Sequence, residues 1–108
     1  MSTSPETGAP NEFLAHLMHG ADLLRANQLE QARGAILAAL ALSPGEARAR
    51  NLLGLVHFRL GELSDSRNIY RGLTSDYPED HGYRLNLGLV HLRIGEIDDA
   101  IAELRRVV

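Results

Sequence analysis

The sequence predicts an all-α fold built from three helix–turn–helix units that stack as a short solenoid. Helical periodicity dominates the chain of 108 residues from about residue 12 onward, with only short breaks. Two nearly identical segments begin 34 positions apart, GLVHFRLGEL at 54–63 and GLVHLRIGEI at 88–97. No segment alternates apolar and polar residues over a useful length, so we expect no sheet. A fixed period of this length is typical of stacked supersecondary units.

Short loops separate six predicted helices, at about 12–26, 29–42, 45–60, 63–75, 80–94 and 97–108. Residues 1–11 are rich in serine, threonine, proline and glycine, and we expect a disordered leader that ends at an N-cap, Asn11. The third helix has the clearest start signal, Ser43-Pro44-Gly45-Glu46. It offers a serine cap, a proline at the first helical position and a glutamate three residues after the cap. Because the loops are short, the two helices within each repeat should be antiparallel partners.

When the chain is aligned with itself at a shift of 34, small and turn-forming residues coincide. The aligned sets are Gly20, Gly54 and Gly88; Ala32, Ser66 and Ala100; Pro44 and Pro78; and Asn27, Gly61 and Gly95. Glycine inside a helix costs about 0.5–1 kcal/mol relative to alanine. We therefore expect the partner helix to approach closely at the helical glycines, and a left-handed helix end at the third set.

These residues resemble the tetratricopeptide repeat, whose pattern is an aromatic residue, Leu-Gly, Tyr, and later Ala, Phe and Pro. The middle copy holds Arg50, Leu53-Gly54, His57, Ser66, Tyr70 and Pro78, and the third holds Arg84, Leu87-Gly88, His91, Ala100 and Leu104. The most divergent copy, the first, holds His16, His19-Gly20, Leu23, Ala32, Ile36 and Pro44, and no copy opens on an aromatic residue. The resemblance implies a domain over 13–108 with repeats at about 13–46, 47–80 and 81–108, the last truncated. It also implies a right-handed superhelix that binds proteins.

Composition excludes several functional classes. A net charge of −3 argues against a nucleic-acid partner, and the lack of cysteine excludes disulfides and thiolate sites. All eleven basic residues are arginine, which is typical of a GC-rich bacterial genome. Residues 1–11 contain no basic segment and no apolar run, so we expect no signal peptide, and no apolar run in the sequence is long enough to cross a bilayer. We expect a cytoplasmic protein with no cofactor and no membrane partner.

The first helix of each unit is apolar on two faces. In the middle copy Ala49, Leu53, Val56 and Leu60 lie on one face and predict the core, as Leu87, Val90 and Ile94 do in the third. In tetratricopeptide-repeat proteins the opposite face lines a concave groove that binds peptides. The resemblance therefore implies a groove formed by Leu17, Ala21, Leu24, Arg25, Arg48, Asn51, Leu55, Phe58, Arg59, Leu85, Asn86, Leu89, Leu92 and Arg93.

Two interpretations of this face are open. The leucines either bind a partner or pack the first helices against one another, and the arginines either bind acidic groups or stay solvated. The carboxylate clamp of chaperone-binding members is absent. Its matching positions hold Leu17, Ala21, Leu52, Gly82 and Asn86, of which only the last is polar.

No motif predicts catalysis or a metal site. His16 and His19 lie three residues apart without a third ligand nearby, and the acidic pairs lie near helix starts, where the helix dipole explains them. His57 and His91 occupy the tyrosine slot, either as structural residues bonded to a neighbour or as a pH sensor. We therefore predict no catalytic residue, no metal ligand and no enzyme.

The last predicted helix leaves an apolar stripe, Ile101, Leu104, Val107 and Val108. We expect either a fragment of a larger bacterial protein or a small protein that dimerises, and self-association in both cases. The predicted function is a scaffold that binds an apolar peptide or helix with acidic flanks. The alternative is an oligomerisation or spacer module whose groove or C-terminal face is filled by another copy of itself.

Overall fold

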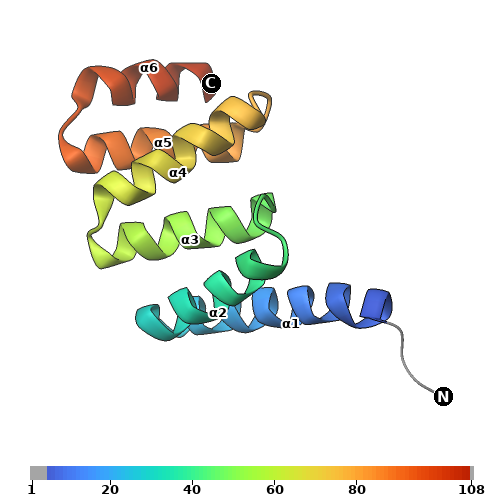
Figure 1. Ribbon diagram of the computed structural model, residues 1–108. Coiled ribbons are helices and arrows are strands. Elements are labelled where there is room, and N and C mark those ends of the chain that lie inside the picture. The colour runs from blue at the N-terminus through green and yellow to red at the C-terminus, as the bar shows by residue number, and fades with distance from the viewer. Residues whose placement is uncertain (1–4, 108) are drawn as a thin grey trace. The chain divides into compact units, whose positions relative to one another are not determined.

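The computed structural model describes residues 5–107, with side chains from Glu12 onward, and this part of the chain forms six α-helices (Figure 1). They are α1 (Pro5–Arg25), α2 (Leu29–Leu42), α3 (Ala47–Leu60), α4 (Leu63–Asp76), α5 (His81–Ile94) and α6 (Ile97–Val107). No strand occurs within residues 5–107. The predicted all-α helical repeat is therefore confirmed. No helix within the described part of the chain is both long and apolar enough to span a membrane.

The start of α1 differs from the predicted start near residue 12. The helix begins at Pro5, so residues 5–11 of the predicted leader are helical and Asn11 lies inside the helix rather than at its cap. Proline is tolerated in the first helical turn because its missing N–H would have no partner within the helix. The prediction relied on the apolar pattern, which begins only at Phe13, and a helix can extend beyond the residues it buries. Residues 1–4 of the predicted leader lie outside the described residues.

The start of α3 differs in its capping residue. Ser43 ends α2, and Glu46 immediately precedes α3. Oε1 of Glu46 accepts hydrogen bonds from the backbone N–H groups of Arg48 (2.8 Å) and Ala49 (3.3 Å), which have no acceptor within the helix. Burial raises the pKa of Glu46, but the bonds from Arg48 and Ala49 outweigh it and leave the pKa below its ordinary value. The predicted serine cap is therefore replaced by a glutamate cap two residues before Arg48.

The turns within the three units share one backbone conformation. Asn27, Gly61 and Gly95 have positive φ angles of 59°, 80° and 102°. These are the aligned positions at which the sequence predicted a left-handed helix end, and glycine and asparagine adopt that conformation at low cost. The repeat period is thus visible in the backbone as well as in the sequence.

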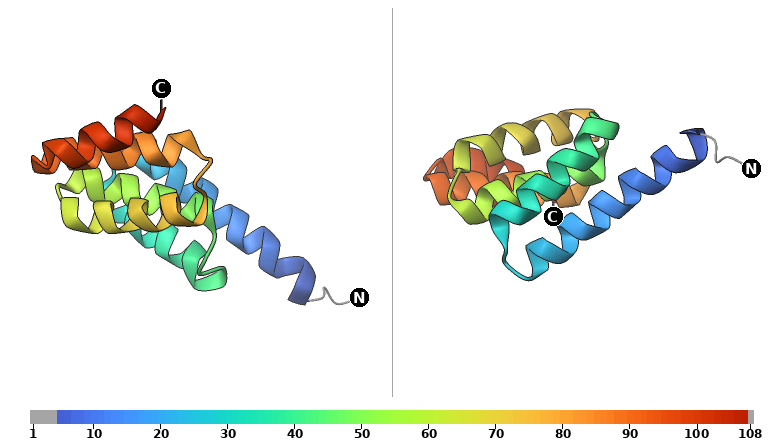
Figure 2. Two further views of the ribbon diagram at one scale, coloured as in Figure 1. Left: turned by 90° about the horizontal axis from the view of Figure 1, so that it is seen from above. Right: turned by 60° about the horizontal axis from the view of Figure 1, so that its bottom comes forward.

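The chain divides into two compact parts, one ending at Val56 and the other beginning at His57, and each has its own packing. In the first part α1 packs along α2, as Figures 1 and 2 show. A Cβ atom added to Gly20 would lie 2.6 Å from Cγ1 of Ile36, so the two helices touch there. The buried apolar residues of this part are Phe13, Leu17, Leu24, Ala32, Ile36, Ala39, Ala49 and Val56.

In the second part α5 packs against both α4 and α6. A Cβ atom on Gly88 would lie 2.8 Å from Cδ2 of Leu104, which confirms the predicted close approach of helices at this glycine. The buried apolar residues are Tyr70, Leu73, Leu87, Val90 and Ala100. Leu104 is thus a packing residue of the α5–α6 pair, which corrects its predicted place in an exposed apolar end. Val107 is half-buried and Val108 lies outside the described residues.

Candidate peptide-binding surface

Exposed apolar side chains form one stripe along α5. Leu85, Leu89 and Leu92 are 40%, 43% and 49% exposed, and their spacing places them on one helical face. Leu87 and Val90, on the other side of the helix, are buried. α5 is therefore apolar on two faces, as the sequence predicted, and the described residues cover only one of them. We call the three exposed residues the leucine stripe.

Arg93 lies next to the leucine stripe, one helical turn after Leu89. Its guanidinium carbon is 5.3 Å from the centre of the Phe58 ring, which belongs to the last turn of α3. This distance is in the range of a cation–π interaction. The ring is half-buried, and Arg93 and its 34-residue equivalent Arg59 are exposed. Sequence reasoning placed Phe58 and Arg93 on the same surface but missed their contact.

The equivalent positions in α1 have different surroundings. Leu17 and Leu24 are only 8% and 4% exposed, so they offer a ligand little surface, which corrects their predicted place on a groove floor. Ala21 is half-buried. The exposed large apolar residues of α1 are instead Leu14 and Met18, which the sequence prediction missed although they lie one turn apart on the helix.

Two predicted groove arginines in the first part have acidic partners within the chain. Arg25 forms an exposed ion pair with Asp22, one helical turn earlier. Nη2 and Nε of Arg48 lie 2.7 and 2.8 Å from Oε2 of Glu46, and the Arg48 guanidinium carbon lies 5.6 Å from the centre of the Phe13 ring. Exposed pairs of this kind contribute little to stability, because solvent screens them. Asn51 and Leu55, the other predicted residues of this part, are half-buried.

Asn86 has a structural contact that the sequence did not predict. It forms a hydrogen bond with the side chain of Tyr70, which lies on α4 against α5. Burial raises the pKa of Tyr70, and the bond with Asn86 offsets this only in part. The hydroxyl group of Tyr70 therefore keeps its proton, and the half-buried Asn86 helps to join α4 to α5.

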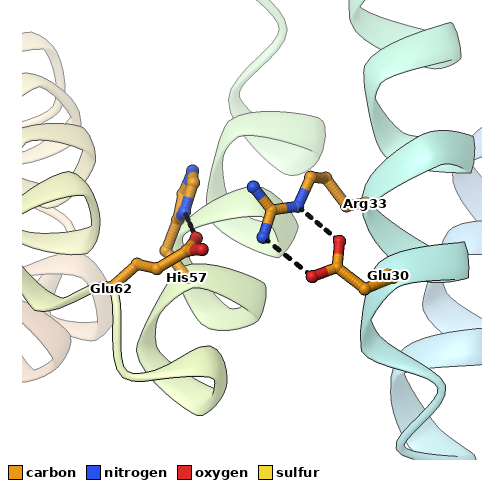
Figure 3. Close-up of polar contacts among 4 residues, drawn as sticks. All are labelled: Glu30, Arg33, His57 and Glu62. Atoms are coloured by element: carbon orange, nitrogen blue, oxygen red, sulfur yellow. Dashed lines mark hydrogen bonds and ion pairs between the residues drawn. The ribbon is translucent and has the colours of Figure 1, made fainter.

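His57 and His91 each make the same hydrogen bond across the turn that follows their helix. Nδ1 of His57 lies 2.7 Å from Oε1 of Glu62 (Figure 3), and Nδ1 of His91 lies 2.7 Å from Oε1 of Glu96. Because a carboxylate only accepts hydrogen bonds, Nδ1 carries the proton and donates it. The expected bond to a neighbour is therefore present at both histidines. Figure 3 also shows a second local pair, Glu30 and Arg33 on α2.

An aspartate near each histidine–glutamate pair completes a group of metal-binding residue types. The ligand atoms lie within 4.8 Å of one another in each group, which are His57, Glu62 and Asp65, and His91, Glu96 and Asp99. Zinc accepts such donors. However, Nη1 of Arg67 lies 2.7 Å from Oε2 of Glu96, so this carboxylate already has a cationic partner. The hydrogen bonds explain the arrangement, and we assign no metal to it.

A model of the tetratricopeptide repeat family matches residues 17–73 and 60–108. The chain belongs to the tetratricopeptide repeat family. A comparison with curated proteins gives no match.

Solved tetratricopeptide-repeat structures share the fold. MamA from Desulfovibrio magneticus RS-1, residues 41 to the end, is 30% identical with a TM-score of 0.83, over 91% of this chain and 55% of that one. The chain thus spans about half the length of this relative. PilF from Pseudomonas aeruginosa is 21% identical (TM-score 0.81), over 93% of this chain and 45% of that one. PcrH, solved with the chaperone-binding region of PopB, is 18% identical (TM-score 0.82), over 98% of this chain and 82% of that one.

In the middle and third copies arginine replaces the aromatic residue that opens the tetratricopeptide repeat, and Arg84 of the third copy shows how it is held. Arg84 is buried and donates hydrogen bonds to the carbonyl oxygen of Pro78 (2.7 Å) and to Oε1 of Glu103 on α6 (3.2 Å). A buried cation is stable only when its donors are satisfied in this way. Arg84 therefore joins α5 to α6 and to the loop before α5. Sequence reasoning noted the substitution but missed both partners.

Proposed function

We propose that the chain is a protein-interaction module that binds an apolar segment with acidic flanks. The leucine stripe and Arg93 form its working surface in the second part of the chain. In the first part, Ala21, Arg25, Arg48, Asn51 and Leu55 are proposed to contact a partner in the same way. We propose no catalytic role for any of these residues.

The observation that carries this proposal is the exposure of three large leucines on one face of α5. Burying a whole leucine side chain contributes about 1.5–3 kcal/mol, so covering the remaining surface of each one contributes on the order of 1 kcal/mol. A contiguous apolar stripe beside a cation is typical of an interaction site. The complex of PcrH with a region of PopB supports the proposal, since it gives an example of the same fold with a protein partner.

The test is a selection experiment in which a displayed library of random linear peptides is passed over the immobilised protein and the bound peptides are recovered. We expect enriched peptides that contain apolar residues and at least one acidic residue. Leu89→Glu should weaken their binding at least tenfold, because it places a charge in the middle of the stripe. Leu37→Glu is the matched control, since Leu37 is also an exposed leucine in a helix, on α2, and should bind as the wild type does.

Two results would count against the proposal. One is a failure of any peptide to be enriched, and the other is equal binding by the wild type and Leu89→Glu. Circular dichroism of both variants would establish that the helices are retained.

A second candidate function, self-association, is favoured by the exposed face of α6. Ile97 and Ile101 are 48% and 42% exposed and lie one helical turn apart. Sedimentation velocity over a range of concentrations should show a dimer or larger species for the wild type and a monomer for Ile101→Glu. A monomeric wild type at the highest concentration would reject this function.

A further inference from the structure

Among the described residues, two arginines lie over phenylalanine rings, and they differ in one respect. Arg48 lies over Phe13 and binds the carboxylate of Glu46 through two nitrogens of its guanidinium group. A guanidinium group carries its N–H donors around its edge, where a carboxylate can accept them. Glu46 occupies that edge at Arg48, so the chain itself shows what such a pair binds.

Arg93 lies over the Phe58 ring at a similar distance, 5.3 Å from its guanidinium carbon to the ring centre compared with 5.6 Å for Arg48 and Phe13. No carboxylate within the described residues forms an ion pair with Arg93, and the cation–π contact is the one interaction of its side chain there. Arg93 is also exposed. The contact with the Phe58 ring thus reduces the freedom of the guanidinium group, and no carboxylate of the described residues binds its N–H donors.

The surroundings of Arg93 suggest how a ligand would approach. Leu89 lies one helical turn before Arg93, and Leu92 directly precedes it. Both leucines are exposed. An apolar side chain of a ligand that covers these leucines would bring its neighbouring residues to the edge of the guanidinium group. A carboxylate is the group that fits that edge, because it accepts two parallel N–H bonds.

We propose that Arg93, held against Phe58, is a receptor for a side-chain carboxylate of a partner peptide. The peptide's apolar residues cover the leucine stripe, and an aspartate or glutamate occupies the position that Glu46 takes at Arg48. A side chain is assigned rather than a C-terminal carboxylate because Glu46 is a side-chain ligand. This assignment rests on the proposed function and adds the chemistry of one contact to it.

The experiment selects peptides from a random linear library on the wild type and on Arg93→Gln and compares the two sets of selected peptides. Every peptide of the library has an amidated C-terminus. We expect an acidic position to be enriched on the wild type and lost on Arg93→Gln. In the best peptide, replacing that residue by its amide should weaken binding to the wild type about fivefold and leave binding to Arg93→Gln unchanged. Fluorescence anisotropy of the two labelled peptides measures this ratio.

Two further variants separate a specific receptor from a general effect of positive charge. Arg105→Gln removes the same charge from an exposed arginine on α6, outside the proposed surface, so the acidic preference should remain. Phe58→Leu keeps the apolar bulk and removes the ring, so the acidic preference should fall while the apolar preference stays.

The outcomes distinguish this assignment from the proposed function. Enriched peptides without an acidic preference, or with one that survives Arg93→Gln, overturn the carboxylate receptor and leave the interaction surface in place. A preference that appears only when the C-terminus is free overturns the side-chain source. Failure to enrich any peptide overturns both the receptor and the proposed function.

Discussion

The contact between Gly20 and Ile36 gives the most quantitative prediction about the fold. The change Gly20→Ala adds one methyl group in the middle of α1, and its carbon would lie 2.6 Å from Cγ1 and 3.4 Å from the backbone nitrogen of Ile36. Ile36 is fully buried, and a β-branched side chain in a helix has one strongly preferred rotamer. The side chain has no room to turn away, so α1 and α2 must move apart.

The magnitude follows from two opposing effects. Alanine improves helix propensity by about 0.5–1 kcal/mol relative to glycine. Overpacking a tightly packed contact costs about 1–3 kcal/mol. We therefore expect Gly20→Ala to lower the free energy of unfolding by about 1–2 kcal/mol, which corresponds to a fall in Tm of roughly 5–15 °C for a chain of this size.

Urea unfolding followed by circular dichroism at the helical band measures this change. Gly34→Ala is the matched control, because Gly34 is an exposed helical glycine with no atom within 4 Å of an added Cβ, and it should be stabilised by about 0.5–1 kcal/mol. In an Ile36→Ala background the cost of Gly20→Ala should largely disappear, as a double-mutant cycle would show. The reasoning is refuted if Gly20→Ala stabilises the chain as much as Gly34→Ala does.

Three further predictions concern single residues. Arg84→Leu should lower the free energy of unfolding by about 2–3 kcal/mol, because it leaves Glu103 and the Pro78 carbonyl group without their donor. In the same urea unfolding experiment, Arg105→Leu at an exposed arginine should stay within about 0.5 kcal/mol of the wild type. Gly95→Ala should lower the free energy of unfolding by about 1–2 kcal/mol, because alanine is strained at a φ of 102°. Gly45 lies in a turn without positive φ, so Gly45→Ala should not lower it. Equal thermal midpoints for the two variants would contradict this. The bond from His91 lowers the pKa of Glu96, burial opposes it and Arg67 lowers the pKa further. The folded pKa of Glu96 lies below the unfolded value of about 4.3, so its stabilisation is present above that pH and is lost as the pH falls through the folded pKa. Glu96→Gln lacks this carboxylate and should therefore lose less stability than the wild type between about pH 6 and pH 3. Urea unfolding midpoints at the two pH values measure the difference.

The positions of most helices could be predicted because the residues that end them are local signals. Asn27, Gly61 and Gly95 supply the left-handed turn wherever the period requires it, and the helices after these turns begin where the sequence predicted. The starts of α1 and α3 were less predictable. Pro5 begins α1 well before its apolar pattern, and Glu46 takes the capping role from Ser43 because its longer side chain reaches two backbone N–H groups.

The candidate site was harder to predict because a repeated sequence does not have repeated surroundings. Leu17 and Leu85 occupy equivalent positions, yet the first is buried and the second is exposed. Exposure depends on which neighbours cover a residue, and a helical wheel contains only the residue's own helix. The bond from His57 to Glu62 was within reach of sequence reasoning, since the same five-residue spacing across a glycine turn recurs at His91 and Glu96.

The most direct test of the central claim is the location of peptide contacts on the chain. Methyl and arginine side-chain resonances would be recorded by NMR while the best peptide from the library selection is added. The leucine stripe and Arg93 should show the largest chemical-shift changes, and Ile97 and Ile101 on α6 should show small ones. Changes centred on α6, or none on α5, would contradict the assignment of the binding surface.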